Sequence, residues 1–506
     1  MKKIGILTFH WADDFGGMLQ AYALKQFLNS RKIGDAEIIP YKTAALRGRY
    51  WIIPYRPKYA NRPVTGAMIK REAKFALRNM PYKLRRMWKM ACFRKRHLTD
   101  KPGISRICST DYDTVVLGSD QIWNPDITYR LEPAYFGAFP KKDSTITVSY
   151  AASLGKPSLD AQYTEQLRKL LKNVDVISVR EETSLEYVKE NSGKEVRWMP
   201  DPTLLLTGDE WKRIVAVPAE KEYVLLHYTE YNPELVSQAV AYAAQYGLKL
   251  VSLKPIHVPG ADIEIRFDIG PEEFLGYILK AECVFTNSFH ATVFSILFQK
   301  SFSCMAHKTL GSRTNDLLSK FGIEMDANSV VSPEQYVSCA EKLQEYRDRA
   351  YQYLLNSTSY KRADITEHCK GCAACALVCP EKAILMKMHQ DGFCYPYINE
   401  QICTNCGKCS RICPDHMKIN PADNQMILGC KCKSEEIRAR STSGGSFYLL
   451  SEQIIQQGGC VYGVVLDSEH RARHVCAESM KEVLPMQGAK YVESELGDCF
   501  QKIKIQ

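Results

Sequence analysis

Residues 113–125 read DTVVLGSDQIWNP, a short apolar run that ends in a polar turn containing a glycine. Residues 145–155, TITVSYAASLG, repeat the same arrangement. A short run rich in β-branched residues and closed by a turn is typical of a buried β-strand. Such runs alternate with amphipathic helical segments through most of the first 350 residues, and this alternation predicts parallel sheets covered by helices.

The alternation forms two blocks. Strands are expected at 4–9, 37–41, 113–117, 145–150 and 174–179 in the first block, and at 223–227, 249–253 and 283–286 in the second. Two such blocks predict an α/β fold with two Rossmann-like halves that face a cleft. Ligands of open α/β sheets bind beyond the carboxyl ends of the strands. The loops expected to carry the site are therefore 10–17, 118–124, 151–155, 180–183 and 286–290.

The overall composition is that of a globular protein, because 45% of the 506 residues are hydrophobic and 25% are charged. At about 150 residues per domain, this length predicts about three domains. No apolar run approaches the roughly 18–20 residues that span a bilayer. The apolar run after the two N-terminal lysines is too short for a secretory signal. We expect a cytoplasmic protein.

The net charge of +10 is concentrated in one segment. Residues 42–97 contain 17 lysines and arginines and a single acid, Glu72, so the rest of the chain is net acidic. In the helix-prone part, residues 65–97, apolar side chains are interleaved with the cations. Such a segment suits an anionic membrane, which implies a peripheral position at the inner membrane face, or an anionic polysaccharide. The alternative is a solvated helix that covers the N-terminal half. No nucleic-acid-binding motif accompanies the segment, so no nucleic-acid partner is expected.

The chain has 19 cysteines, and eleven of them lie between residues 369 and 432. Eight of the eleven form two C-x2-C-x2-C-x3-C runs, each followed by proline: Cys369, Cys372, Cys375 and Cys379, then Cys403, Cys406, Cys409 and Cys413. Without a secretory signal, dense cysteines indicate metal or cluster ligands rather than disulfides. A four-cysteine zinc site is the alternative, but two identical runs closed by proline favour iron–sulfur clusters.

These runs resemble the bacterial ferredoxin module with two [4Fe–4S] clusters, which implies a small α+β domain at residues 363–420. In two-cluster ferredoxins the fourth cysteine of each run binds the other cluster. The resemblance therefore implies two ligand sets: Cys369, Cys372, Cys375 and Cys413, and Cys403, Cys406, Cys409 and Cys379. A module of this kind transfers electrons between partners.

Six stretches of the first 350 residues resemble polysaccharide pyruvyl transferases: GGMLQAYAL (16–24), LGSDQIWNP (117–125), SYAASLG (149–155), ISVREETS (177–184), DPTLLL (201–206) and TNSFHATVFSILFQKSF (286–302). The family has two Rossmann-like domains in a glycosyltransferase-B-like fold, which implies domains at 1–195, with an insertion at 42–97, and at 196–350. Its members transfer a pyruvyl group from phosphoenolpyruvate to sugar hydroxyls, usually as a cyclic ketal on a cell-surface polysaccharide or its precursor. The resemblance implies this activity, with a sugar or lipid-linked glycan as acceptor.

The chemistry of this reaction indicates the residue types to expect. Arginine binds the carboxylate and phosphate of phosphoenolpyruvate, and a histidine suits the proton transfers. The resemblance places the key histidine at His290 and an important arginine at Arg180, and Arg313 is a further candidate catalytic residue that clamps the anion. The expected substrate-binding residues are Gly16, Gly17, Ser119 and Asp120, with Asp120 holding a sugar hydroxyl.

Each of these residues also has a structural alternative. A histidine at a helix start often caps or packs the helix, Arg180 can pair with Glu181 or Asp175, and the two glycines can simply permit a tight loop. No G-x-G-x-x-G follows the first strand, so nothing supports nicotinamide binding there.

Residues 435–497 resemble the N-terminal domain of the beta subunits of coenzyme F-420 hydrogenases and dehydrogenases, through EEIRARSTSGGSFYLLSEQIIQQGGCVYGVVLD (435–467) and MQGAKYVES (486–494). That family carries flavin, so the resemblance implies that Ser443, Gly444 and Gly445, ahead of a helix, cradle the phosphate of FAD. The chain stops at Gln506, where the family continues into a larger second domain. We therefore expect a short α/β module at 428–506 with a partial flavin site, which docks or relays electrons to a flavoprotein partner.

Two functions follow from these resemblances. In the first, the chain is a polysaccharide pyruvyl transferase with an attached iron–sulfur electron-transfer module. In the second, it is an electron-transfer protein that serves a flavoenzyme, and the α/β region is a glycan-binding scaffold. A docking protein with degenerate activities is a third alternative. The candidate residues at 180, 290 and 313 favour the transferase.

Overall fold

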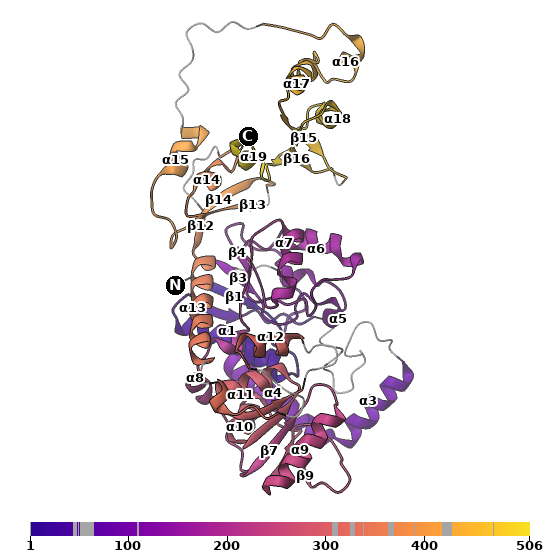
Figure 1. Ribbon diagram of the computed structural model, residues 1–506, viewed down its shortest axis with the longest axis vertical. Coiled ribbons are helices and arrows are strands. Elements are labelled where there is room, and N and C mark those ends of the chain that lie inside the picture. The colour runs from indigo at the N-terminus through magenta and orange to yellow at the C-terminus, as the bar shows by residue number, and fades with distance from the viewer. Residues whose placement is uncertain are drawn as a thin grey trace. The chain divides into compact units, whose positions relative to one another are not determined.

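The computed structural model divides the chain into two compact units, Met1–Thr358 and Ser359–Gln506 (Figure 1). It describes residues 2–43, 48, 50, 65–108, 111–305, 312–323, 329–336, 339–362, 369–389, 391–416, 428–468 and 470–505. Unit 1 contains two parallel sheets, and unit 2 contains two small three-stranded sheets. The predicted α/β fold with two Rossmann-like halves, followed by two smaller modules, is confirmed. The finer boundaries predicted at residues 195, 350 and 420 stay predictions.

The N-terminal sheet of unit 1 has the strand order β2-β1-β3-β4, and all of its pairings are parallel. Its strands are β1 (Lys3–Leu7), β2 (Asp35–Ile38), β3 (Thr114–Leu117) and β4 (Ile146–Ser149). Every residue of β3 and β4 is buried, which explains their continuous apolar character. Parallel bridges from Val148 and Ala152 continue the sheet toward β5 (Ile177–Val179), which pairs with β6 (Val196–Trp198).

The C-terminal sheet of unit 1 has the order β11-β10-β7-β8-β9, again fully parallel. Its strands are β7 (Tyr223–His227), β8 (Lys249–Ser252), β9 (Ile263–Ile265), β10 (Cys283–Thr286) and β11 (Ser301–Cys304). The connecting α9 (Pro233–Tyr246) shows why the chain turns where it does. Asn232 caps its first turn, Pro233 occupies the first position, and Gly247 ends it at φ +63°.

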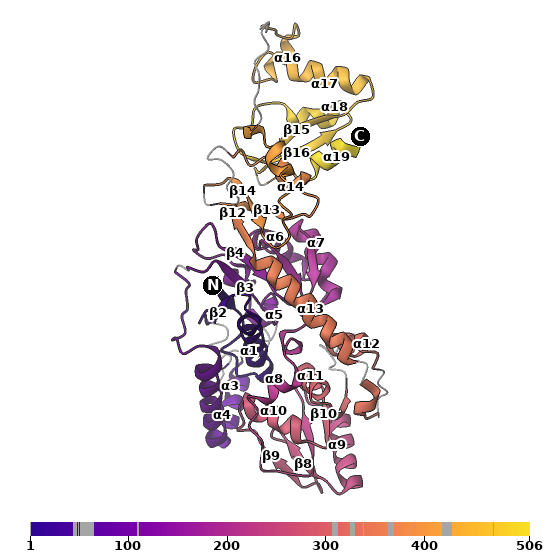
Figure 2. The same cartoon turned by 90° about the vertical axis from the view of Figure 1, so that its left-hand side faces the viewer.

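The remaining long helices of unit 1 cover these sheets. They are α1 (Phe15–Ser30), α6 (Thr164–Leu171), α7 (Leu185–Ser192), α10 (Pro271–Lys280), α11 (Phe289–Leu297), α12 (Ser312–Lys320) and α13 (Cys339–Thr358). Although α13 follows the C-terminal sheet in sequence, it returns along the N-terminal one (Figures 1 and 2). Its Tyr353 hydroxyl donates a hydrogen bond to Ser149 O (2.8 Å) at the end of β4. The two halves are therefore linked by more than the chain connection between β6 and β7.

The helix-prone part of the basic segment is helical, as predicted. It forms α3 (Gly66–Arg78) and α4 (Met80–Phe93), followed by a π-helical turn at Arg94–Leu98. Only Asn79 separates α3 from α4, and backbone hydrogen bonds run across this junction, from Asn79 N–H to Phe75 O (3.1 Å) and from Lys83 N–H to Asn79 O (2.9 Å). Most of the preceding stretch, 44–64, lies outside the described residues.

Unit 2 begins with the antiparallel sheet β12-β14-β13, made of β12 (Tyr360–Arg362), β14 (Cys394–Asn399) and β13 (Ile384–Met388). Two short helices, α14 (Ala374–Val378) and α15 (Lys408–Ile412), carry the third cysteine of each run and end just before the fourth. The C-terminal module has the sheet β15-β16-β17, made of β15 (Val461–Leu466), β16 (Ala472–Ala477) and β17 (Ser494–Glu495). The helices of this module are α16 (Glu435–Ala439), α17 (Ser446–Gln456), α18 (Met480–Val483) and α19 (Cys499–Ile505).

Candidate functional site

The five loops expected to carry the site do converge in unit 1. The start of α1 closely approaches the turn between β10 and α11, where Gly16 lies beside His290. Side-chain contacts join the loops after β3, β4 and β5 to one another, and Asp201 lies near His290. Five charged or titratable residues lie at the centre of these contacts, and we call them the His290 site: Asp120, Arg180, Glu181, Asp201 and His290.

Arg180 follows β5 and is the buried hub of the His290 site. Its Nη1 lies 2.9 Å from Asp201 Oδ2 and 3.9 Å from Asp120 Oδ1, and its Nε lies 3.2 Å from Glu181 Oε1. Burial opposes the charge of the guanidinium, but these carboxylates raise the pKa of Arg180 above its ordinary value. The pairing with Glu181, which the sequence left open, is therefore present. This pairing leaves Nη2 of Arg180 available for a contact with substrate.

Asp201 lies beside the catalytic candidate His290. One carboxylate oxygen of Asp201 accepts hydrogen bonds from the backbone and the hydroxyl of Thr203 (3.0 and 2.7 Å). The other oxygen binds Arg180 and lies 3.8 Å from His290 Nε2. Burial alone would raise the pKa of Asp201, but His290 and Arg180 lower it below its ordinary value. A fixed, ionised carboxylate beside an imidazole is the arrangement that supports acid–base work by histidine.

Three polar atoms of the His290 site lack a protein partner. Arg180 Nη2, Glu181 Oε2 and His290 Nε2 are buried and form no hydrogen bond with any described residue. Buried polar groups are nearly always satisfied in folded proteins, so each exception calls for an explanation. A guanidinium donor, a carboxylate acceptor and an imidazole nitrogen in one buried cluster are suited to bind the oxygen atoms of a substrate.

Asp120 and Ser119 follow β3 and differ in their surroundings. Asp120 has φ +72°, a conformation that few residues other than glycine adopt, and such residues concentrate at functional sites. Ser119 is fully buried, its hydroxyl donates to Ala151 O (2.9 Å), and its backbone N–H donates to Gln20 Oε1 (3.2 Å). Ser119 therefore supports the loop, and its role toward substrate stays a prediction.

The two glycines at the start of α1 face the His290 site. A Cβ on Gly16 would lie 2.0 Å from His290 Nδ1, whereas a Cβ on Gly17 would lie 3.4 Å from Asp120 Oδ2. Gly16 is thus required by the close approach of His290, a reason that the sequence alone did not indicate. The predicted contacts of both glycines with substrate remain untested.

The sequence predicts no catalytic or substrate-binding role for several residues that the structure places here. Asp201 belongs to the DPTLLL stretch and Glu181 to ISVREETS. The family resemblance therefore included both residues, but the sequence did not indicate what either one binds. Ser153, in SYAASLG, donates to Glu181 Oε1 (2.6 Å). Arg313 belongs to α12, but its side chain lies outside the described residues, so its predicted role as an anion clamp stays a prediction.

Two further histidines are buried near the ends of strands. His10 follows β1, and His227 ends β7, where it pairs in register with Thr286 of β10. Burial lowers the pKa of each histidine from the ordinary 6.5 to about 3. Nearby cations lower the pKa further: Arg94 and Lys42 act on His10, and Lys254 and Arg86 act on His227. Both imidazoles are therefore neutral at physiological pH.

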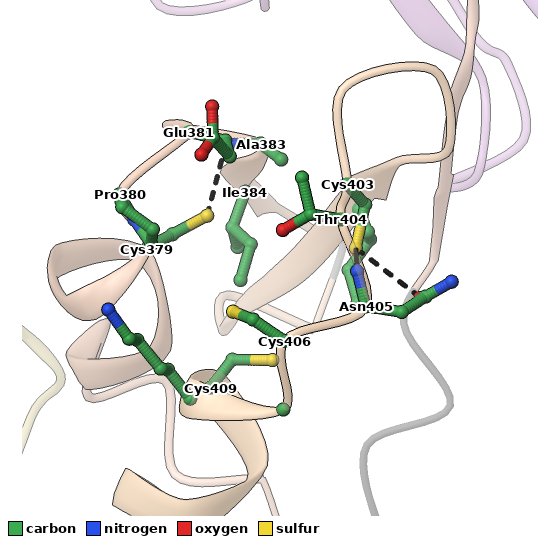
Figure 3. Close-up of a pocket in the computed structure, with 13 residues that line it drawn as sticks. Cys379, Pro380, Glu381, Ala383, Ile384, Cys403, Thr404, Asn405, Cys406 and Cys409 are labelled. Carbon is green, nitrogen blue, oxygen red and sulfur yellow. Dashed lines mark hydrogen bonds between the residues drawn. The ribbon is translucent and has the colours of Figure 1, made fainter.

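In unit 2 the eight cysteines of the two runs line two separate pockets. The first pocket is lined by Cys369, Cys372 and Cys375 of the first run and by Cys413 of the second. The second is lined by Cys403, Cys406 and Cys409 and by Cys379 of the first run (Figure 3). Each pocket thus takes its fourth thiol from the other run, as the ferredoxin resemblance implies.

The backbone around the pockets repeats almost identically. Gly371 and Ala373 in the first run, and Asn405 and Gly407 in the second, occupy equivalent positions, and all four have positive φ. Backbone N–H groups donate to the sulfur atoms of Cys379 (from Ala383, 3.3 Å) and Cys403 (from Asn405, 3.4 Å). Four thiols and N–H groups directed at sulfur fit a [4Fe–4S] cluster, which supplies one-electron transfer when bound. No three His, Cys, Asp or Glu side chains in the described part of the chain are placed to hold a single metal ion.

The loop predicted to cradle a flavin phosphate lies at the start of α17. Ser443 and Gly445 line a pocket together with residues 486–489. Gly445 has φ +81°, and a Cβ on Gly444 would lie 2.7 Å from Cys430 O, so both positions suit glycine. Binding of FAD at this loop remains a prediction.

The fold and the sites define a class: an α/β enzyme with two parallel-sheet halves and a buried ionic site, carrying a domain with two four-thiol pockets. Residues 14–309 match the profile of polysaccharide pyruvyl transferases, and residues 368–417 match that of a 4Fe–4S dicluster domain. The chain belongs to the polysaccharide pyruvyl transferase family and carries a 4Fe–4S dicluster domain, which confirms both resemblances. Neither match reaches residues 435–497, so the F-420 resemblance stays a prediction.

Solved structures with similar folds include UDP-GlcNAc 2-epimerase from Neisseria meningitidis bound to UDP-GlcNAc (10% identity, 71% of this chain and 97% of that chain, TM-score 0.35). A second is MnaA of S. aureus with UDP (13% identity, 71% of this chain and 91% of that chain, TM-score 0.35). A third is heptosyltransferase WaaC of E. coli (10% identity, 63% of this chain and 99% of that chain, TM-score 0.28). At these TM-scores we draw no functional argument from them. A comparison with curated proteins returned no match. No helix among the described residues is long and apolar enough to cross a membrane.

Substitution of Gly16 by alanine should displace His290. The added Cβ would overlap the imidazole, whereas Gly17→Ala would only touch Asp120 and Phe9 O at 3.4 Å. We expect Gly16→Ala to lower transferase activity by about 100-fold, the order of effect of a misplaced catalytic group, and Gly17→Ala to retain activity within about tenfold. Because the overlap also strains the folded state by about 1–3 kcal/mol, thermal unfolding of both variants is measured beside activity. Equal activity of the two variants would contradict this geometry.

The stability of unit 1 should fall in mild acid. Since the folded-state pKa of His10 and of His227 is about 3, below the ordinary 6.5, only the unfolded chain gains these protons as pH drops through this interval. Each histidine then lowers the free energy of unfolding by up to about 1.4 kcal/mol per pH unit. All six tryptophans lie in unit 1, so urea unfolding followed by tryptophan fluorescence reports on this unit alone. We expect His227→Gln to reduce the pH slope and His257→Gln, at an exposed position, to leave it unchanged. An unchanged slope in His227→Gln would refute the assignment.

Paired cysteine substitutions should reveal the exchange of ligands between the runs. Cys379 and Cys403 line the same pocket, so the double variant Cys379→Ser/Cys403→Ser should lose one cluster and keep about half of the iron. Cys375 and Cys379 belong to one run but line different pockets, so Cys375→Ser/Cys379→Ser should lose both clusters. Iron and sulfide per chain are measured after anaerobic purification, with Cys394→Ser as the control. The reverse ranking of the two double variants would show that each run binds its own cluster.

Proposed function

We propose that the His290 site transfers a pyruvyl group from phosphoenolpyruvate to a pair of sugar hydroxyls, in the synthesis of a cell-surface polysaccharide. The observation that carries this proposal is the group of three unpartnered buried atoms on Arg180, Glu181 and His290. Membership of the pyruvyl transferase family supports the reaction class.

The proposed reaction assigns each group a task. A sugar hydroxyl attacks the central carbon of the enol phosphate while the terminal CH2 gains a proton, and His290 moves this proton. Phosphate then leaves, and a second hydroxyl attacks the same carbon to close the ketal. One of the two hydroxyl protons ends in the new methyl group, and the other leaves with phosphate.

The surroundings of Arg180 refine its predicted role. Two of its three nitrogen atoms already bind the protein's own carboxylates, so Nη2 alone remains to bind a substrate oxygen. Three carboxylates beside one guanidinium are better suited to hold sugar hydroxyls than to hold a trianion by themselves. In this proposal Asp120 and Glu181 bind the acceptor, and Arg313 supplies further positive charge for phosphoenolpyruvate.

The dicluster domain carries a second proposal, electron transfer to a flavoprotein partner, with the pocket at Ser443 and Gly445 as a partial FAD site. Two four-thiol pockets in one domain support this electron-transfer role. If the domain serves a flavoenzyme that modifies a sugar, unit 1 would act as its glycan-binding scaffold.

Phosphate release from phosphoenolpyruvate distinguishes the two functions. We expect the anaerobically purified protein to release phosphate only when a suitable acceptor sugar is present. His290→Ala should lower this rate by about 10²–10⁴-fold, the usual contribution of an acid–base group. His257→Ala, at an exposed position, is the matched control. If a broad acceptor panel yields no phosphate while a flavoprotein re-oxidises dithionite-reduced clusters, the transferase proposal fails and the electron-transfer proposal holds.

A further inference from the structure

The two successive basic helices α3 and α4, which we call the basic helix pair, have two chemically different faces. On α4, Arg86, Met90 and Phe93 are buried, at the i, i+4 and i+7 spacing of one helix face. Arg86 Nε donates to Asp13 Oδ1 (2.9 Å), and its guanidinium lies 4.3 Å from the centre of the Phe15 ring. This inner face is therefore fixed to the loop that begins α1.

Further cations of the segment bind the C-terminal half of unit 1. Lys89 pairs with Glu273 (2.5 Å), and Arg96 and His97 both contact Glu272 (2.6 and 3.0 Å). These carboxylates account for the inner cations of the segment. The inner face thus covers unit 1, as in the alternative of a solvated covering helix. This alternative does not explain the outer face.

The outer face is apolar and cationic at the same time. Trp88 and Leu84 are 66% and 48% exposed on α4, and Leu77 is 67% exposed at the end of α3. Isolated apolar side chains are common on protein surfaces, but exposed apolar side chains that gather in one region mark interaction sites. Tyr82 is also exposed (46%), whereas Phe75 packs its ring edge-to-face against Phe267 (6.0 Å between ring centres) and belongs to the inner side.

Basic side chains of α3 accompany this apolar group. Lys70, Lys74 and Arg78 form no ion pair with any acidic residue that the structure describes, and α3 contains a single acid, Glu72, which is bound by Arg71. An exposed surface that combines tryptophan, leucine and unpaired cations matches the interface of an anionic bilayer, where apolar side chains enter the acyl boundary and cations meet the headgroups. An anionic polysaccharide or nucleic acid would use the cations but not the exposed leucines.

We propose that the basic helix pair is an interfacial anchor that binds anionic lipid through Leu77, Leu84 and Trp88 together with the cations of α3. Its inner face positions this anchor on unit 1, because Arg86 binds Asp13 beside the α1 N-cap Asp14. The same helix start carries Gly16, which touches His290. Anchoring would hold the His290 site near the membrane surface, where lipid-linked glycans are found; this last step rests on the proposed function.

Sedimentation with vesicles tests the anchor without reference to catalysis. The full-length protein is mixed with vesicles of phosphatidylcholine alone or of phosphatidylcholine and phosphatidylglycerol in equal parts. We expect binding to the anionic vesicles only, weakened by salt because charge screening shortens the range of the attraction. Leu84→Ser/Trp88→Ser and Lys74→Glu/Arg78→Glu should each reduce the bound fraction by about tenfold.

Matched controls come from exposed positions elsewhere on unit 1. Val217→Ser removes a side chain that is 61% exposed, and Lys249→Glu reverses an exposed charge, and both should bind vesicles as the parent protein does. Absence of binding to anionic vesicles at low salt, or equal loss in the controls, would overturn the proposal. A different result would assign the outer face to a soluble polyanion: the protein binds heparin or DNA but not vesicles, and Leu84→Ser/Trp88→Ser does not change that binding. Phosphate release with a soluble acceptor should be unchanged in Leu84→Ser/Trp88→Ser and in Lys74→Glu/Arg78→Glu. Failure of the anchor and failure of the transferase proposal are therefore distinguishable.

Discussion

The buried guanidinium of Arg180 is the interaction on which the organisation of unit 1 depends. Asp120, Glu181 and Asp201 come from loops after different strands, and their carboxylates would repel one another in a buried site without a central cation. Removing one partner from such a cluster leaves a buried charge uncompensated, which typically destabilises a protein by about 3–5 kcal/mol. The ion cluster therefore holds the strand ends together and also places an ionised carboxylate, that of Asp201, 3.8 Å from His290 Nε2.

Sequence patterns predicted the features that depend on residues close to one another in the chain. The strand at 223–227 coincides with β7, and the two parallel sheets follow from apolar runs alternating with helices. The arrangement of cysteines around the two pockets was also predictable, because the spacing within each run restricts where the fourth thiol can reach. These features need only periodicity, capping residues and spacing.

Features that depend on convergence in space were not predictable in this way. Asp201 was visible only as part of DPTLLL, because nothing in that stretch shows that its carboxylate meets Arg180. For Gly16 the sequence predicts contact with substrate or, as the alternative, a tight loop, and neither indicates that its lack of a side chain makes room for His290. The total charge was similarly uninformative until the ion pairs with Asp13, Glu272 and Glu273 separated the inner cations from the outer ones.

Those ion pairs also connect the two halves of unit 1, since Asp13 belongs to the N-terminal half and Glu273 to the C-terminal half. Through Arg86 and Lys89, α4 thus binds both halves and restrains any motion of one relative to the other. The α13 helix adds a second tie through Tyr353.

The exchange of thiols between the two cysteine runs has a consequence for biosynthesis. As the chain emerges from the ribosome, the first run is complete at Cys379, yet the pocket that contains Cys369 still lacks Cys413. The pocket built around the second run already has its four thiols once Cys409 has appeared. The earlier run therefore belongs to the pocket that closes last, and neither pocket is complete in a nascent chain that ends between the two runs.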